Sequence, residues 1–428
     1  MNTYRHIIGY INYLAFLVLI CAMPYAFPFI RFFGLVWAIS WLFELRFLQP
    51  ENIRLTKSRL FVSIGFAVFV LWNIISIFWA NNKAVSWEFL QRYIYLLIVP
   101  VMMVFGVNEQ YNWKQIIKIL TISCAISIGV YLFTTYWLLN PTLIHNKHIP
   151  SATVDIDWRH LQDFTLNMKH RLHYTSLFCL AIIGINTLFV EQQTTRKQTA
   201  FYVLAILLFL TGIYWTTSRA ALINLALIAM LTVLWIWTRR QPRTTQQKAS
   251  VAALAALIMA VGVLAFYKFY PRNANMTPDY IQNIPDGTTP PCEPRVAIWT
   301  AALESPADYS IHGLGVGNSL DYLQAKYQAH GWEAYYTYHY SAHSQLLTTW
   351  MELGLAAMIL WILFWLKMPF VFRGKERYWV ACVSAVCLVN MSTDLFLGGV
   401  EGVVFVIVAF VLLDVLSRPL PPVVRPQP

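Results

Sequence analysis

The amino-acid sequence predicts an all-α integral membrane protein with about twelve transmembrane helices. Of its 428 residues, 58% are hydrophobic and only 12% are charged, whereas about a quarter of the residues in a soluble domain are charged. The apolar residues form segments close to the roughly 20 residues that cross a bilayer as a helix. The predicted spans are residues 7–23, 27–44, 60–79, 89–106, 116–139, 176–191, 199–216, 220–238, 250–267, 345–366, 378–393 and 403–417.

The distribution of lysine and arginine predicts the orientation of these spans. Basic residues occupy alternate connections, which in a twelve-span chain all fall on one side, and the short connections opposite carry only Lys83 and Arg219. Because cytoplasmic loops of membrane proteins are enriched in basic residues, both termini are predicted to be cytoplasmic. This topology accounts for the net charge of +11, so no nucleic-acid partner is expected.

Two long connections fall on the opposite, periplasmic side. The second is rich in tyrosine, tryptophan and glycine, too many aromatic residues for a disordered tether, and it is predicted to form an ordered cap of short helices. One of these is expected at 294–304, because Pro294 suits a first helical turn and Pro306 a stop. The predicted regions are spans one to nine within 1–267 with a loop at 140–175, the large loop at 268–343, spans ten to twelve within 344–417, and a proline-rich cytoplasmic tail at 418–428.

His343 is the first candidate for chemistry, because it lies at the predicted start of the tenth span. A neutral imidazole there can accept a proton from a hydroxyl. Gly354 follows eleven residues later, which returns to the same helix face about 16 Å deeper and permits close helix packing. The alternative is an interfacial histidine that only hydrogen-bonds to a loop.

Three basic residues on the predicted periplasmic side are candidates for holding an anion. Arg219 stands at the outer end of the eighth span, where positive charge is least expected, and the arginine fork suits phosphate oxygens. Arg171 and Lys169 close the first long loop. The alternatives are an arginine whose stem lies along apolar surface with its head in water, and a basic cluster among lipid headgroups.

The large loop supplies the remaining candidates. Arg295 and Trp299 are one turn apart on the predicted short helix and either face a sugar or make a structural contact with each other. Residues 313–317, Gly-Leu-Gly-Val-Gly, lack the strand–turn–helix context of a dinucleotide fingerprint and indicate a tight turn, which either serves only as a turn or also presents N–H groups to an anion.

Aromatic and ionisable residues near the late spans complete the set. Tyr338 and His339 lie in an aromatic run that stacks on sugar rings or forms an interfacial belt. Asp394 and Glu352 are ionisable at membrane depth, which makes them functional candidates, although Glu352 points away from His343 on one helix. The outer face has no paired carboxylate motif, so no metal and no other cofactor are expected.

The order of these features resembles the O-antigen ligase and polymerase superfamily of bacterial inner-membrane proteins. The resemblance rests on Ser218-Arg219, on Arg295 with Trp299, on Gly315 with Gly317, and on a motif of His343-Ser344, nine residues and Gly354. The last motif position is Ala357, where the family has Gly, Thr or Tyr. The ordered set covers most of the chain and is more specific than the single motif.

The resemblance implies a GT-C-like fold in the inner membrane and the transfer of a glycan from undecaprenyl pyrophosphate to an acceptor in the periplasm. The chain looks most like the ligases, whose acceptor is a sugar hydroxyl of lipid A-core, then like the O-antigen polymerases, and then like the protein O-oligosaccharyltransferases. His343 would be the general base. Arg219, Arg295 and Arg171 would hold the pyrophosphate, and a single displacement would invert the anomeric carbon. A polyprenyl-linked glycan transporter is the non-enzymatic alternative, which the clustering of arginines at one face disfavours.

Overall fold

A computed structural model gives the arrangement of the chain and describes residues 2–25, 27–139, 171–216, 218–240 and 294–418. These residues form helices and no strands, as the composition predicts. Eight of the helices are long and apolar enough to cross a membrane, so the chain is an integral membrane protein. The predicted ninth span, 250–267, and most of the loop at 140–175 lie outside the described residues.

The predicted spans within the described residues coincide with helices or pairs of helices. The first half of the chain forms α1 (Asn2–Ala22), α2 (Phe27–Phe43), α3 (Lys57–Ser76), α4 (Lys83–Ile94), α5 (Ile98–Phe105) and α6 (Trp113–Leu139). The second half forms α9 (Arg171–Val190), α10 (Arg196–Trp215), α11 (Arg219–Arg240), α18 (Leu355–Val371), α19 (Gly374–Thr393) and α20 (Val400–Leu416). Helix α20 is buried at every position except Glu401, so it forms the centre of the bundle. Whether the chain crosses the membrane twelve times stays a prediction.

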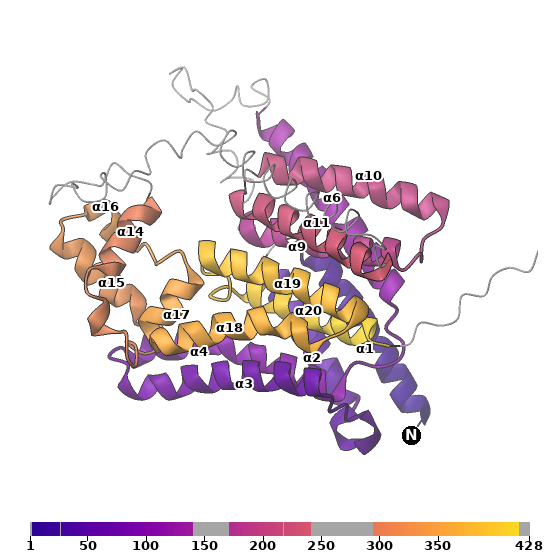
Figure 1. Ribbon diagram of the computed structural model, residues 1–428, viewed down its shortest axis with the longest axis horizontal. Coiled ribbons are helices and arrows are strands. Elements are labelled where there is room, and N and C mark those ends of the chain that lie inside the picture. Colours follow the sequence, from indigo (N-terminus) through magenta and orange to yellow (C-terminus); the bar gives the residue numbers. More distant parts are fainter. Residues whose placement is uncertain (1, 26, 140–170, 217, 241–293, 419–428) are drawn as a thin grey trace, which may run out of the picture.

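The described part of the large loop is an ordered unit with its own core. It contains α14 (Pro294–Leu303), α15 (Ser319–Ala329) and α16 (Glu333–Thr337), and α14 ends within one residue of the predicted boundary. Their buried side chains include Ile298, Tyr309, Leu323, Tyr327 and Trp332. Figure 1 shows these helices gathered at one end of the bundle, which we call the loop end, opposite the N-terminus at the terminal end.

The prediction of one continuous tenth span over 345–366 is wrong. The chain forms a nine-residue helix, α17 (Gln345–Leu353), and then breaks at Gly354 before α18 begins. Gly354 has φ +90°, and a Cβ there would lie 2.4 Å from the Ile311 carbonyl oxygen. Only glycine tolerates both conditions, so Gly354 makes a turn against the loop unit and does not share a helix face with His343.

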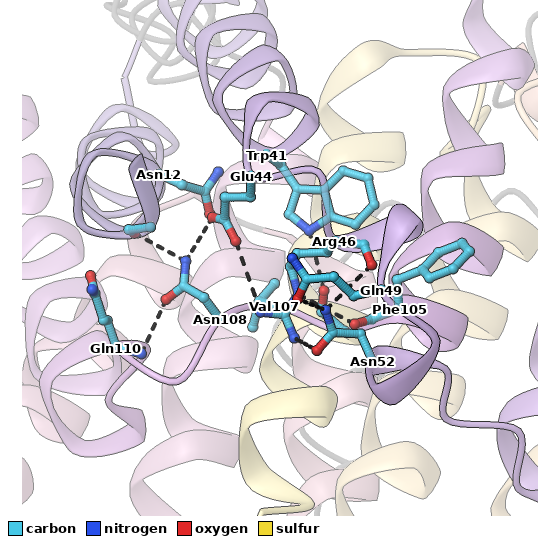
Figure 2. Close-up of polar contacts among 12 residues, drawn as sticks. Asn12, Trp41, Glu44, Arg46, Gln49, Asn52, Phe105, Val107, Asn108 and Gln110 are labelled. Carbon is cyan, nitrogen blue, oxygen red and sulfur yellow. Dashed lines mark hydrogen bonds and ion pairs between the residues drawn. The ribbon is translucent and has the colours of Figure 1, made fainter. Parts of the chain in front are cut away.

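Charged side chains join the helices at the terminal end. Figure 2 shows Glu44, just after α2, accepting a hydrogen bond of 2.7 Å from the Asn108 amide of the α5–α6 connection, and Arg46 donating to Asn52 at 3.1 Å. Nearby, the fully buried Asp414 of α20 contacts Arg59 at 2.7 Å and Arg418 at 3.0 Å. These contacts fix the end of α20 against α3 and α5.

The predicted orientation of the spans in the membrane can be tested by cysteine labelling. If the basic connections are cytoplasmic, a single cysteine placed at Thr288 in a cysteine-free background should react with an impermeant maleimide on intact spheroplasts, and one at Gln246 should not. The measurement is the labelled fraction of each variant before and after permeabilisation. Labelling at 246 without labelling at 288 would reverse the topology.

Candidate active site

His343 lies at the loop end, just before α17, in a backbone conformation that is rare for its residue type. Its φ is +45°, in the left-handed region, where a residue other than glycine is uncommon. The indole N–H of Trp299 donates to the Ala342 carbonyl at 2.9 Å. On the other side, the Ser344 hydroxyl caps α17 by accepting from the Leu347 N–H at 3.3 Å. Residues on both sides therefore fix the direction of the His343 side chain, and such strained conformations persist mainly at functional sites.

The structure brings Asp394 beside His343. The imidazole Nδ1 lies 3.5 Å from the Asp394 Oδ1, and the side chains are 32% and 15% exposed, so the pair is accessible to a ligand. The backbones are joined as well, because the Gln345 N–H donates to the Asp394 carbonyl at 2.9 Å. The two residues are 51 positions apart in sequence; His343 lies two residues before α17, and Asp394 directly follows α19. The sequence marked each of them separately but did not predict their contact.

Helix α4 contributes two residues that the sequence reading missed. The Gln345 amide donates to the Tyr93 hydroxyl at 2.9 Å and accepts from the Leu397 N–H at 3.2 Å. The Arg92 guanidinium donates to the Gly398 carbonyl at 2.9 Å. Both contacts hold the segment after Asp394 in place. In the sequence, Arg92 could have been recognised as a candidate, because a charged residue within an otherwise apolar span is a functional candidate by default.

A buried polar network places the starts of α9 and α11 beside the end of α19. The Asn390 amide donates to the Ser176 hydroxyl at 2.8 Å, and the Asn224 amide donates to the Asn390 side-chain oxygen at 3.0 Å. All three residues are nearly inaccessible to solvent. The three helices pack against one another (Figure 1).

The position of this network shows at which end of the bundle Arg219 and Asp394 lie. Arg219 is five residues before Asn224 on α11, and Asp394 is four residues after Asn390, directly after α19. Each backbone position is therefore about 6–8 Å from the network, on the side of the loop end. Ser218, which precedes Arg219, accepts a hydrogen bond of 3.4 Å from Thr175 of α9. Arg171 is the first residue of α9 and therefore belongs to the same end, while Lys169 lies outside the described residues.

The structure shows a contact of Trp299 that the sequence did not predict. Arg295 and Trp299 are one turn apart on α14, as predicted, but the Trp299 indole donates to the carbonyl that precedes His343. Its ring remains 36% exposed. Trp299 therefore links the helix that carries Arg295 to the histidine turn.

The glycine-rich turn anchors the loop unit to the bundle. The amides of Leu314 and Gly315 donate to the carbonyls of Met351 and Glu352 at 2.8 and 2.9 Å, and the Val316 amide donates to the Ser76 hydroxyl at 3.0 Å. These N–H groups are satisfied within the protein, so the turn is a docking element and not an anion site. A Cβ on Gly315 would lie 2.5 Å from Ala80, which explains the glycine.

Glu352 supports this docking and does not contact His343. The Ser319 hydroxyl donates to its carboxylate at 2.6 Å. Burial raises the pKa of Glu352 to about 7, above its usual range. Because the folded-state pKa is raised, the contribution of Glu352 to stability is present at acid pH and is lost as the pH rises through about 7. Helix α17, which carries it, is too short to cross a membrane.

The aromatic run leads away from His343 toward solvent. The Tyr340 ring lies 6.0 Å from the His343 ring and 6.3 Å from the Tyr338 ring, and Tyr338 is 73% exposed. His339 has φ +50° and lies 6.3 Å from Tyr336. This arrangement gives a row of aromatic rings that begins at the histidine. Among the residues that the structure describes, no three His, Cys, Asp or Glu side chains are grouped as metal ligands.

Comparison with known proteins supports the resemblance in the sequence. Residues 204–362 match the family model described as O-antigen ligase. The matched region contains Arg219, Arg295, Trp299, His343 and Gly354, whereas Asp394 and Arg171 lie outside it. No curated protein matches the chain. The helical membrane bundle, the ordered motifs and this match agree: residues 204–362 are similar to the O-antigen ligase family, whose members are glycosyltransferase-like membrane enzymes.

Proposed function

We propose that this protein is an O-antigen ligase of the bacterial inner membrane. It transfers polysaccharide from undecaprenyl pyrophosphate to a sugar hydroxyl of lipid A-core at the periplasmic face. The observation that carries the proposal is the His343–Asp394 pair at the loop end, 3.5 Å apart and accessible, beside the start of the helix that carries Arg219. The undecaprenyl donor and the lipid A-core acceptor follow from the likeness to the ligases of the superfamily.

The pair supplies the proton acceptor. With Nδ1 directed at the Asp394 carboxylate, Nε2 is the nitrogen that takes the proton from the attacking hydroxyl. Asp394 then stabilises the imidazolium that forms, as a carboxylate does in other histidine-based sites. The acceptor oxygen forms a bond to the anomeric carbon while the bond from that carbon to the phosphate oxygen breaks, so one displacement inverts the configuration.

The arginines stabilise the leaving group. The electron pair of the broken bond passes to the pyrophosphate, and the guanidinium groups of Arg219 and Arg295 offset the negative charge that develops there. Arg171 adds to this positive field from the start of α9. The aromatic row from Tyr340 to Tyr338 supplies ring faces for sugar, with His339 and Trp299 at its margins.

The proposal is tested by transfer in vitro with purified protein, undecaprenyl-pyrophosphate-linked glycan and lipid A-core. Glycan on lipid A-core supports the ligase. Longer carrier-linked chains without the lipid A-core product would identify a polymerase, and movement of the donor across vesicles without transfer would identify a transporter. Either of these outcomes overturns the proposal.

Transfer is expected to be independent of divalent metal, because arginines take the place of a metal ion at the pyrophosphate. The initial rate should be unchanged within about two-fold after treatment with EDTA. The measurement is the rate before chelation, after chelation, and after adding back Mg²⁺ or Mn²⁺. A lost rate that metal restores would contradict the role assigned to the arginines.

Replacing either arginine by lysine should weaken donor binding and slow transfer. A lysine is a point charge and cannot reproduce the two-pronged contact of a guanidinium with phosphate oxygens. Arg219→Lys and Arg295→Lys are therefore each expected to lose about ten-fold or more in donor affinity, since a hydrogen bond to a charged group contributes about 1.5–3 kcal/mol. The control is Arg373→Lys, at the terminal end of the bundle. If both site variants keep the wild-type donor affinity and transfer rate, Arg219 and Arg295 do not bind the pyrophosphate.

A further inference from the structure

One turn of the loop unit, residues 310–312, carries an isoleucine that the described part of the chain leaves uncovered. Ile311 is 85% exposed, the highest value among the exposed large apolar residues of the described chain. Single apolar side chains on a water-facing surface are ordinary. The surroundings of Ile311 therefore decide whether it faces water or lipid.

The backbone around Ile311 is bonded to the bundle. The Ser310 carbonyl accepts from the Leu355 N–H, in the first turn of α18, at 2.9 Å. The Ser310 hydroxyl accepts from the Trp350 indole of α17 at 3.3 Å, and the Ile311 carbonyl lies against Gly354. Irregular backbone is tolerated at membrane depth where its polar groups are satisfied by the protein. The Ser310 carbonyl and hydroxyl meet this condition, while the Ile311 side chain projects outward.

Helix α3 gives the depth of this turn. Helices α3 and α18 pack side by side (Figure 1), and the Trp72 indole of α3 donates to the Leu353 carbonyl, directly before the break that Ile311 contacts, at 3.2 Å. Trp72 is fifteen residues after Lys57, the first residue of α3, or about 22 Å along the helix. The hydrocarbon core of a bilayer is about 30 Å thick, and the candidate span continues to Trp79. The turn therefore lies beside the outer part of a membrane-crossing segment.

The outward side of α3 is apolar past the level of the turn. Its exposed residues recur three, four or seven positions apart, which places them on one helix face. They are Ile64, Val68, Leu71 and Phe78, with exposed fractions of 51%, 55%, 53% and 80%. On a helix that crosses a membrane, such a face contacts lipid.

The turn adjoins this face. Trp72, which reaches the chain break beside Ile311, is itself 42% exposed. The next residue of the turn, His312, has its ring 6.2 Å from the Trp79 ring at the outer end of the span. Ile311 thus continues the lipid-facing surface of α3 from the side of the loop unit.

We propose that the turn at 310–312 inserts Ile311 among the acyl chains of the leaflet at the loop end, so that the loop unit rests in the membrane surface. Trp350, which bonds to Ser310, belongs to α17, and α17 begins two residues after His343. The lipid contact therefore also sets the height of the His343 turn relative to the bilayer. The inference does not depend on the proposed ligase activity, because it concerns only how the loop unit meets lipid.

Fluorescence quenching from the lipid and from the water tests this contact. Ile311→Cys in a cysteine-free full chain carries a bimane fluorophore in nanodiscs, where acyl-brominated phospholipid quenches from the lipid and iodide quenches from the water. Ile311→Cys should be quenched by brominated lipid and little by iodide, as should Leu360→Cys on the exposed side of α18. Gln328→Cys, exposed near the end of α15, is the matched control within the loop unit and should show the reverse.

Two outcomes of this experiment would overturn the proposal. Iodide quenching at position 311 equal to that at position 328 would place the turn in water. Protection from both quenchers would show that another segment of the chain or a second copy covers Ile311.

A second measurement uses the unaltered protein and so does not depend on the folding of a variant. A phospholipid with a diazirine in its acyl chain is photolysed in nanodiscs that contain the wild type, and labelled tryptic peptides are located by mass spectrometry. The peptide 296–326, released by cleavage after Arg295 and Lys326, should carry the label at 310–312. Labelling of α18 at Leu360 without labelling at 310–312 would contradict the insertion of Ile311.

Discussion

Replacing His343 by alanine should lower the transfer rate by about 10²–10⁴-fold, the usual contribution of a positioned general base. Donor affinity should remain near that of the wild type, because in the proposed mechanism the arginines hold the pyrophosphate and the imidazole acts only on the acceptor hydroxyl. The measurement is the transfer rate at saturating donor together with donor affinity, both on purified protein. Asp394→Asn should also slow transfer, because an amide stabilises the imidazolium less well than a carboxylate does.

The control for this experiment is His312→Ala. His312 also lies in the loop unit, where its ring is 6.2 Å from Trp79, and it does not contact Asp394 in the structure. It should retain transfer within a few-fold. If folded His343→Ala transfers at the wild-type rate between pH 6 and 8, His343 is not the base, and Asp394 or His339 becomes the candidate.

The second large effect is expected from Asp414, at the other end of the bundle. Asp414→Asn should destabilise the protein by about 3–5 kcal/mol, the usual cost of removing one partner from a buried ion pair. The carboxylate is fully buried and contacts Arg54, Arg59 and Arg418 at 3.4, 2.7 and 3.0 Å. It also accepts from the Val107 N–H at 3.1 Å, so its loss leaves three guanidinium groups without their common partner.

Thermal unfolding in detergent, followed by tryptophan fluorescence, measures this effect. The control is Glu88→Gln, which removes an ion pair with Arg92 whose carboxylate side chain is 65% exposed. Exposed pairs contribute little, about 0–1 kcal/mol, so the control should unfold near the wild-type temperature. Equal unfolding temperatures for Asp414→Asn and Glu88→Gln would show that the arginine cluster does not depend on Asp414.

Long-range contacts explain the parts of the candidate site that the sequence did not reveal. His343, Arg219 and Asp394 could be singled out because a charged or titratable residue at the edge of an apolar span is unusual, and Arg295 because it lies one turn from Trp299 on a predicted short helix. The distance between His343 and Asp394 could not be predicted, because it depends on how α17 meets the end of α19. The Tyr93–Gln345 bond joins residues 252 positions apart, and no local pattern marks it.

The sequence alone determined the helical class, the apolar helices of the described residues apart from the broken tenth span, and the short helix that starts at Pro294. These features are local: a helix forms wherever an apolar run must satisfy its own backbone hydrogen bonds in lipid, and proline sets boundaries through its fixed φ. The tertiary structure decided the break at Gly354 and the use of the glycine-rich turn. A glycine within an apolar run suits either close helix packing or a turn, and only the approach of the Ile311 carbonyl, with φ at +90°, selects the turn.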